Sequence, residues 1–107
     1  MKVNKITIHC PISLSALIAH FQNAIADSEY KEMIKIVPVG TLAFTVTISK
    51  AGTSVLSFTQ IDPKEDGKCN VMLYKSDIAF LHKSSIPAVM DWIKQEVEKI
   101  GGNVIPE

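Results

Sequence analysis

The residues of this sequence best suited to chemistry are two cysteines, Cys10 and Cys69, and three histidines. His9 and Cys10 are neighbours in a segment where apolar and polar residues alternate, which is typical of a strand. Adjacent side chains of a strand point to opposite faces, so these two cannot readily act at one site. Cys10 falls on the apolar face, and we expect a buried structural thiol. The alternative is a reactive thiol, activated by a helix that begins just after it, near Ser13.

A metal site would need ligands at short, regular spacings. The soft ligands are Cys10, His20, Cys69 and His82, and their separations match no zinc-binding pattern. We therefore expect no metal and no cofactor. The two cysteines could form one disulfide, but two small buried thiols in a reducing compartment are the favoured interpretation.

Acidic residues cluster at Asp62, Glu65 and Asp66, and the alternate positions of Asp62, Lys64 and Asp66 faintly resemble a calcium-binding loop. The glycine is one position out and the closing glutamate is absent, so we expect a solvated loop over 62–68 instead. Gly-rich phosphate loops, a nucleophile elbow and a His-Glu-x-x-His motif are absent from the sequence. This excludes an enzyme with a recognisable motif and leaves, as an alternative, one built from scattered residues.

The chain has 107 residues, of which 47% are apolar, and its formal net charge is zero. All eleven basic residues are lysines. Arginine supplies the planar donors that grip phosphates and guanine edges, so its absence argues against a nucleic-acid reader. No apolar run approaches the ~18 residues of a membrane span, and residues 6–17 contain too many polar side chains for a signal peptide. We expect a single domain over residues 1–107, with no membrane association and a cytoplasmic location.

Hydrophobic periodicity indicates the elements that must position any site. Alternation predicts strands over 3–10, 33–39, 41–49, 53–61 and 69–74. A helical stripe predicts helices over 13–27 and 85–100, begun by Ser13 and Ser85, with Glu96 on the solvent side of the second. Residues 76–83 could be a strand or a buried loop, and 103–107 a frayed tail unless Val104 and Ile105 dock. Lys75 alternates onto an apolar face, which suggests that the strand leaves the sheet there or that the lysine enters a pocket.

The predicted order is β-α-β-β-β-β-α. It favours an α+β two-layer sandwich, with a mainly antiparallel sheet and both helices on one face. This order resembles the TATA-binding-protein-like folds and, more loosely, the helix-grip folds of the START and Bet v 1 type. The resemblance covers most of the chain, rests on element order alone and transfers no functional residue. In helix-grip families it implies an apolar ligand pocket under the terminal helix, which a chain this short could form only as a small cavity.

Two helices can cover only one face of such a sheet, and the other face is nearly free of charged residues. We therefore expect a non-enzymatic binding or assembly module, a homodimer formed through this uncharged face. The expected interface residues are Thr45, Thr47, Val55, Ser57, Met72 and Tyr74. The alternative is an ordinary threonine-rich solvent face, which antiparallel sheets commonly show.

A second functional hypothesis is a pocket between sheet and helices that binds a small apolar ligand. Its lining would be Phe21, Phe44, Phe58, Leu73, Met90 and Trp92. The alternative is that these side chains simply pack together as core. A void above about 300 Å³ between the layers would favour the ligand, since this is the lower size of ligand pockets.

Overall fold

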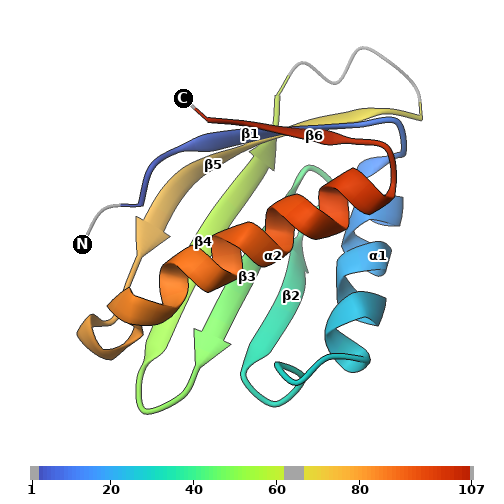
Figure 1. Ribbon diagram of the computed structural model, residues 1–107. Helices are drawn as coiled ribbons and strands as arrows, with labels where there is room; N and C mark the ends of the chain where they lie inside the picture. The colour runs from blue at the N-terminus through green and yellow to red at the C-terminus, as the bar shows by residue number, and fades with distance from the viewer. Residues whose placement is uncertain (1–2, 62–66, 107) are drawn as a thin grey trace.

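The computed structural model describes residues 3–61 and 67–106, and within them the chain forms one antiparallel sheet with two α-helices (Figure 1). The elements are β1 (Ile6–Cys10), α1 (Leu14–Ala26), β2 (Ile34–Val39), β3 (Ala43–Ser49), β4 (Thr53–Gln60), β5 (Cys69–Asp77), the 3₁₀ helix η1 (Phe80–Ser85), α2 (Ile86–Lys99) and β6 (Asn103–Pro106). The strand order across the sheet is β2-β3-β4-β5-β1-β6. The α+β fold predicted from the sequence is confirmed. The expected acidic loop residues Asp62, Glu65 and Asp66 lie outside the described residues.

Both helices pack on the same face of the sheet. The Phe21 ring of α1 lies 6.0 Å from Phe44 of β3 and 5.6 Å from Trp92 of α2, between ring centroids. Figure 1 shows α2 running across the central strands while α1 lies beside β2. The apolar stripe of each helix therefore faces the strands, as its period requires. Among the described residues, neither helix is long and apolar enough to cross a membrane.

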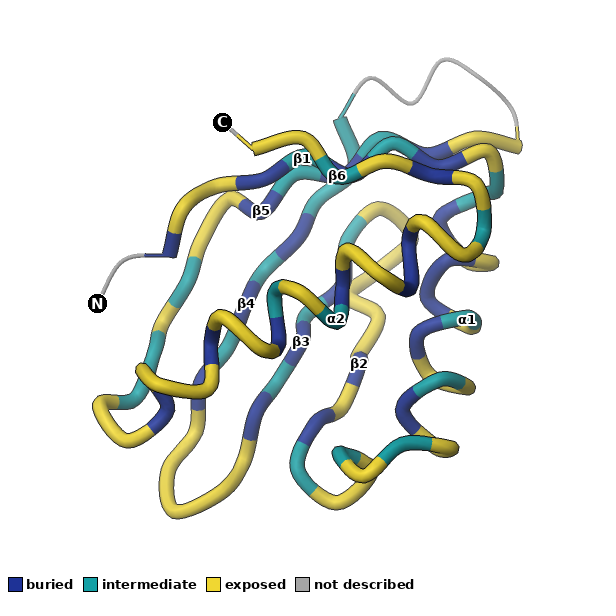
Figure 2. The backbone as a smooth tube through the Cα atoms, in the orientation of Figure 1, coloured by how far each residue is buried: buried dark blue, intermediate teal, exposed yellow. Residues whose placement is uncertain are grey.

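The core lies between the sheet and the helices, and buried and less buried residues alternate along the strands (Figure 2). The largest fully buried side chains all come from this layer: Ile8, Leu17, Phe21, Ile34, Phe44, Val46, Leu56, Phe58, Val71, Leu73, Ile93 and Val97. Each such burial stabilises the fold by roughly 1.5–3 kcal/mol before conformational entropy is counted. The inner face of the sheet is therefore fixed by packing, and so is the identity of the residues left on the opposite face.

The C-terminal segment is a strand and not a frayed tail. Residues of β6 pair antiparallel with β1, and Val104 lies opposite Ile8. Gly101 has a φ of 83°, which ends α2 and turns the chain back onto the sheet. Val104 and Ile105 thus dock, as the sequence allowed, and β6 becomes one edge of the sheet.

The segment that follows the last predicted strand also differs from expectation. Strand β5 continues to Asp77, and η1 then runs directly into α2, so residues 76–83 are neither one strand nor a loop. Ser85 precedes α2, but its side chain makes no capping hydrogen bond.

A β-bulge explains the position of Lys75. Ser57 pairs with Lys75 while the next residue, Phe58, pairs with Leu73, so Tyr74 is an extra residue in β5. The extra residue shifts the alternation and moves Lys75 to the face of Ser57. The strand neither leaves the sheet at this lysine nor directs it into a pocket.

Candidate functional site

The face of the sheet that points away from both helices is here called the outer face, and all six strands contribute to it. One row of cross-strand neighbours crosses it from edge to edge. Its members are Val39, Ala43, Thr59, Met72, Thr7 and Ile105, one from each strand. Directly opposite side chains lie about 5 Å apart, so this uncharged row is a continuous strip.

Two further rows complete the centre of the outer face. One contains Val37, Thr45, Ser57 and Lys75, and the other contains Lys35, Thr47, Val55 and Asp77. The predicted interface residues Thr45, Thr47, Val55, Ser57 and Met72 are half-buried and share this face. The sixth, Tyr74, lies at the bulge and is 48% exposed.

Exposed apolar groups of the outer face lie at its two edge strands, whereas its charged groups lie on β2 and on the interior strand β5. Val39 at the β2 edge is 52% exposed, and Ile105 at the β6 edge is 48% exposed. Lys35 and Asp77 stand at opposite ends of one row, on β2 and β5. The bulge moves both Lys75 and Asp77 onto the outer face, so this face carries two more charges than simple alternation predicts.

A buried polar cluster that sequence reasoning missed lies at the β3–β4 turn. Ser54 is fully buried on the inner face, and its Oγ accepts a hydrogen bond from the Ala79 backbone N–H at 2.8 Å. His82, which is 4% exposed, contacts Ser54 Oγ through Nδ1 and the Lys50 carbonyl through Nε2 at 2.7 Å. A carbonyl only accepts, so Nε2 carries the proton and the Ser54 hydroxyl donates to Nδ1. The available sequence signal was a serine in the apolar register of β4.

This Ser–His pair holds the fold together and is not placed for catalysis. A nucleophile must meet its substrate, and Ser54 has no exposed surface. Its partners come from the β3–β4 turn and from η1, which joins β5 to α2. The cluster therefore fixes the start of α2 against the sheet.

Replacing Ser54 with alanine is expected to lower the free energy of unfolding by about 1–3 kcal/mol, because the His82 ring and the Ala79 N–H lose their buried partner. Urea unfolding followed by circular dichroism measures the loss. Ser49→Ala is the matched control: Ser49 is exposed on the neighbouring strand, and its loss should stay within about 0.5 kcal/mol. Equal losses for the two variants would contradict the assigned role.

A second buried polar contact joins the two helices. Glu96, expected on the solvent side of α2, is 5% exposed. Its Oε1 lies 3.2 Å from His20 Nε2 of α1, and its Oε2 accepts from Lys99 Nζ at 2.8 Å. The stripe of α2 did not reveal this position because the burial comes from α1 packing alongside it. The Lys99 ammonium thus donates to this buried carboxylate, while His20 Nε2 lies near its other oxygen and makes no hydrogen bond to any described residue.

The six residues predicted to line an apolar ligand pocket lie on the inner side of the sheet. Phe44 and Phe58 stack with ring centroids 4.8 Å apart, and Phe21 tilts against Phe44. Leu73 is also fully buried, while Met90 and Trp92 are partly buried at the margin of the core. These rings fill space against one another.

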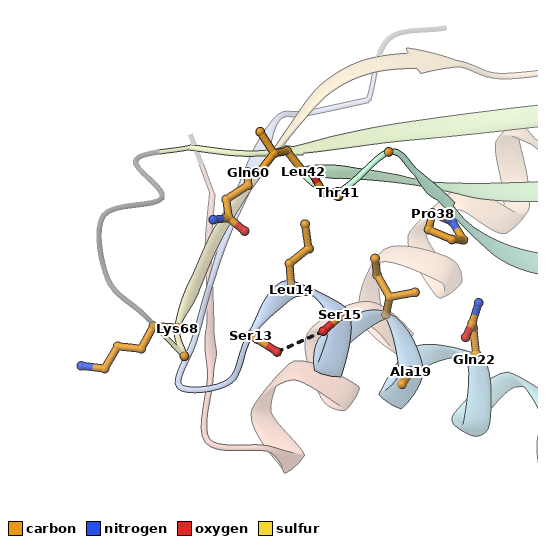
Figure 3. A pocket seen from close by; sticks show the side chains of 13 residues that line it. Ser13, Leu14, Ser15, Ala19, Gln22, Pro38, Thr41, Leu42, Gln60 and Lys68 are labelled. Carbon is orange, nitrogen blue, oxygen red and sulfur yellow. Dashed lines mark hydrogen bonds between the residues drawn. The ribbon is translucent and has the colours of Figure 1, made fainter.

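A pocket of about 610 Å³ lies elsewhere, between the first turns of α1 and the β2–β3 turn (Figure 3). Its lining includes Leu14, Ile18, Pro38, Leu42 and Gln60, and it contains none of the six predicted residues. Ser13 Oγ, also in the lining, already accepts from the Ala16 N–H as the cap of α1. Gln22 Nε2 donates to the Ile36 carbonyl at 3.1 Å. Part of the polar lining of this pocket is thus already used in hydrogen bonds, one that caps α1 and one that joins α1 to β2.

Of the four soft ligands considered from the sequence, the structure brings together only the cysteines. Cys10 and Cys69 lie directly opposite one another on β1 and β5. Both are free and buried. His20 lies beside Glu96, and His82 lies beside Ser54.

These features differ in whether they are accessible to another molecule. The Ser54–His82 and His20–Glu96 contacts are internal, while the outer face presents six strands to the surroundings. No protein-family model, no curated protein and no solved structure gives a significant match to this chain.

Proposed function

We propose that this chain is a non-enzymatic assembly module that forms a homodimer through the outer face of its sheet. The observation that carries the proposal is the uncharged row, which runs from Val39 at one edge to Ile105 at the other. A face intended only for water commonly carries many charged side chains, whereas a strip of apolar and hydroxyl groups gains free energy when it is covered. The chain's zero net charge adds no general repulsion between copies.

The opposite charges of Lys35 and Asp77 favour a second copy as the partner. In a symmetric dimer each contact occurs twice, with the two residues exchanged between subunits. A two-fold axis parallel to the strands, passing between β3 and β4, places β2 of one subunit over β5 of the other. Lys35 and Asp77 stand at the two ends of one row. Lys35 of each subunit then lies opposite Asp77 of the partner subunit, which gives two equivalent ion pairs.

The same axis matches the four residues of the uncharged row on β2 to β5 to one another, and Thr7 and Ile105 lie outside this contact. Val39 would meet Met72 of the partner subunit, and Ala43 would meet Thr59 of the partner subunit. Large apolar groups thereby pair at the sides of the interface and small groups pair near the axis. Two sheets stacked in this way pack about 10 Å apart, with their side chains interdigitated.

The contact is modest in size. Four strands offer a footprint of about 20 × 20 Å, which is at the small end of specific interfaces, so we expect a dissociation constant on the order of micromolar. We place this dimer in the cytoplasm, because both cysteines are free thiols and structural disulfides accumulate in oxidising compartments.

Sedimentation analysis across low to high micromolar concentration tests the proposal, and a concentration-dependent dimer is expected. Lys35→Glu and Asp77→Lys should each weaken dimerisation about tenfold, because each places like charges together at two symmetric positions. The double variant Lys35→Glu/Asp77→Lys should recover most of the affinity.

The matched control is Lys31→Glu, which makes the same charge change at an exposed residue before β2 begins. It should leave the dimer unchanged. A wild-type chain that stays monomeric at high micromolar concentration would refute the proposal. A double variant no better than the single variants would refute the proposed axis.

A further inference from the structure

Two thiols face each other inside the sheet, on the side opposite the proposed dimer interface. Cys10 ends β1 and Cys69 begins β5, and the two residues are direct cross-strand partners. Both belong to the apolar core, with exposed fractions of 5% and 2%. They are separated by more than half the chain, so only the pairing of β1 with β5 brings them together.

Their geometry is close to that of a disulfide. Directly opposite residues of antiparallel strands have Cα atoms about 4.5–5.5 Å apart, within the roughly 4.4–6.8 Å that disulfides require. Their Cβ atoms, about 4.5–5.5 Å apart, need to approach by only about 1 Å to reach bonding geometry. The pair can therefore be bridged without rearranging the sheet.

The two sulfurs also differ in readiness to react. A hydrogen bond from the Cys10 thiol lowers the pKa of Cys69, although burial acts against this. The same hydrogen bond, burial and the charge of Cys69 raise the pKa of Cys10. The thiolate is the attacking form in disulfide exchange, so the lowered pKa favours attack by Cys69.

Access to the pair is controlled by the turn between α2 and β6. A methyl group placed on Gly102 would lie 3.1 Å from Cys10 Sγ, so the backbone of this turn covers the thiol closely. The adjoining strand β6 has four residues and forms an edge of the sheet. Short edge elements open locally at lower cost than central strands, and such an opening exposes the sulfurs.

We infer that Cys10 and Cys69 form an oxidation-sensitive dithiol site that takes up a cross-strand disulfide, with a low-molecular-weight disulfide as the oxidant. The Cys69 thiolate attacks one sulfur of the oxidant, forms a mixed disulfide and expels one thiolate. The Cys10 sulfur then loses its proton, attacks Cys69 Sγ and expels the second thiolate. The protein dithiol is oxidised by two electrons, and one oxidant disulfide is reduced to two thiols.

Oxidised glutathione is the probe, applied to the full chain and followed by alkylation and mass spectrometry. The expected product is a monomeric chain that has lost two hydrogen atoms, with the peptides of Cys10 and Cys69 linked. The bridge closes a long loop, so the thermal midpoint should rise by on the order of 10 °C. Reduction with dithiothreitol should reverse both changes.

Single variants identify the order of attack. Cys10→Ser should stop at a mixed disulfide with glutathione on Cys69, and it should form that adduct faster than Cys69→Ser does on Cys10. The double variant should show no midpoint change with oxidant. The inference is overturned if the wild type, under conditions that oxidise its urea-unfolded form, stays fully reduced or yields only glutathione adducts or intermolecular bonds. Because the thiols lie on the inner face, these outcomes are independent of the dimer.

Discussion

Phe44→Ala is expected to lower the free energy of unfolding by about 3–5 kcal/mol. Phe44 has no exposed surface, and its ring contacts Phe58 and Phe21 from the sheet and from α1. Removing the ring loses its transfer free energy and leaves a cavity that this interlocked cluster cannot readily close. A domain of this size has a total stability of about 5–15 kcal/mol, so a large fraction disappears. Urea unfolding measures this loss, and the dependence of the free energy of unfolding on urea concentration should stay unchanged.

Phe80→Ala is the matched control because it makes the same chemical change at a side chain that is 78% exposed. Phe80 contacts only the Lys83 ammonium among its described ring contacts, so its loss should stay within about 1 kcal/mol. If Phe44→Ala cost no more than Phe80→Ala, the space around Phe44 would not be filled by protein. That result would favour the predicted apolar ligand pocket over core packing.

Gly102→Ala is expected to destabilise the protein by about 1–3 kcal/mol through overpacking. A Cβ at this position would lie 2.7 Å from the His9 carbonyl oxygen and 2.8 Å from Val97 Cγ1. The first of these atoms is backbone of β1 and cannot rotate aside, so β6 must move away from the sheet. Thermal unfolding measures the loss. The same variant should make Cys10 and Cys69 react faster with oxidised glutathione, because the turn that covers them is displaced.

Gly40→Asn separates this contact effect from a general intolerance of glycine replacement. Gly40 has a φ of 63°, which asparagine adopts more readily than most residues, and no atom lies within 4 Å of its potential Cβ. Its stability should change by no more than about 0.5 kcal/mol. A Gly102→Ala variant as stable as Gly40→Asn would show that β6 adapts without strain. It would contradict the claim that the turn at Gly102 packs closely over the Cys10 thiol.

Elements with strong local periodicity could be predicted from the sequence. Strand β3 alternates without a break, and the stripes of α1 and α2 repeat over several turns, so the side of each residue followed from its position. The same parity separated the inner face from the outer face and placed Cys10 with the core. A local pattern is sufficient for these elements because the alternation of buried and exposed positions repeats several times along one strand or helix.

Features that depend on distant partners could be found only from tertiary contacts. Four residues of β6 are too few for a periodic signal, and they form a strand because β1 offers them an edge. The bulge at Tyr74 reverses the side of Lys75 through its pairing with β4. Ser54 with His82, Glu96 with His20, and Cys10 with Cys69 each join residues far apart in the chain. Such contacts follow from strand register and from the packing of the helices on the sheet. Both depend on how the whole core packs, so they cannot be predicted from a short segment of sequence.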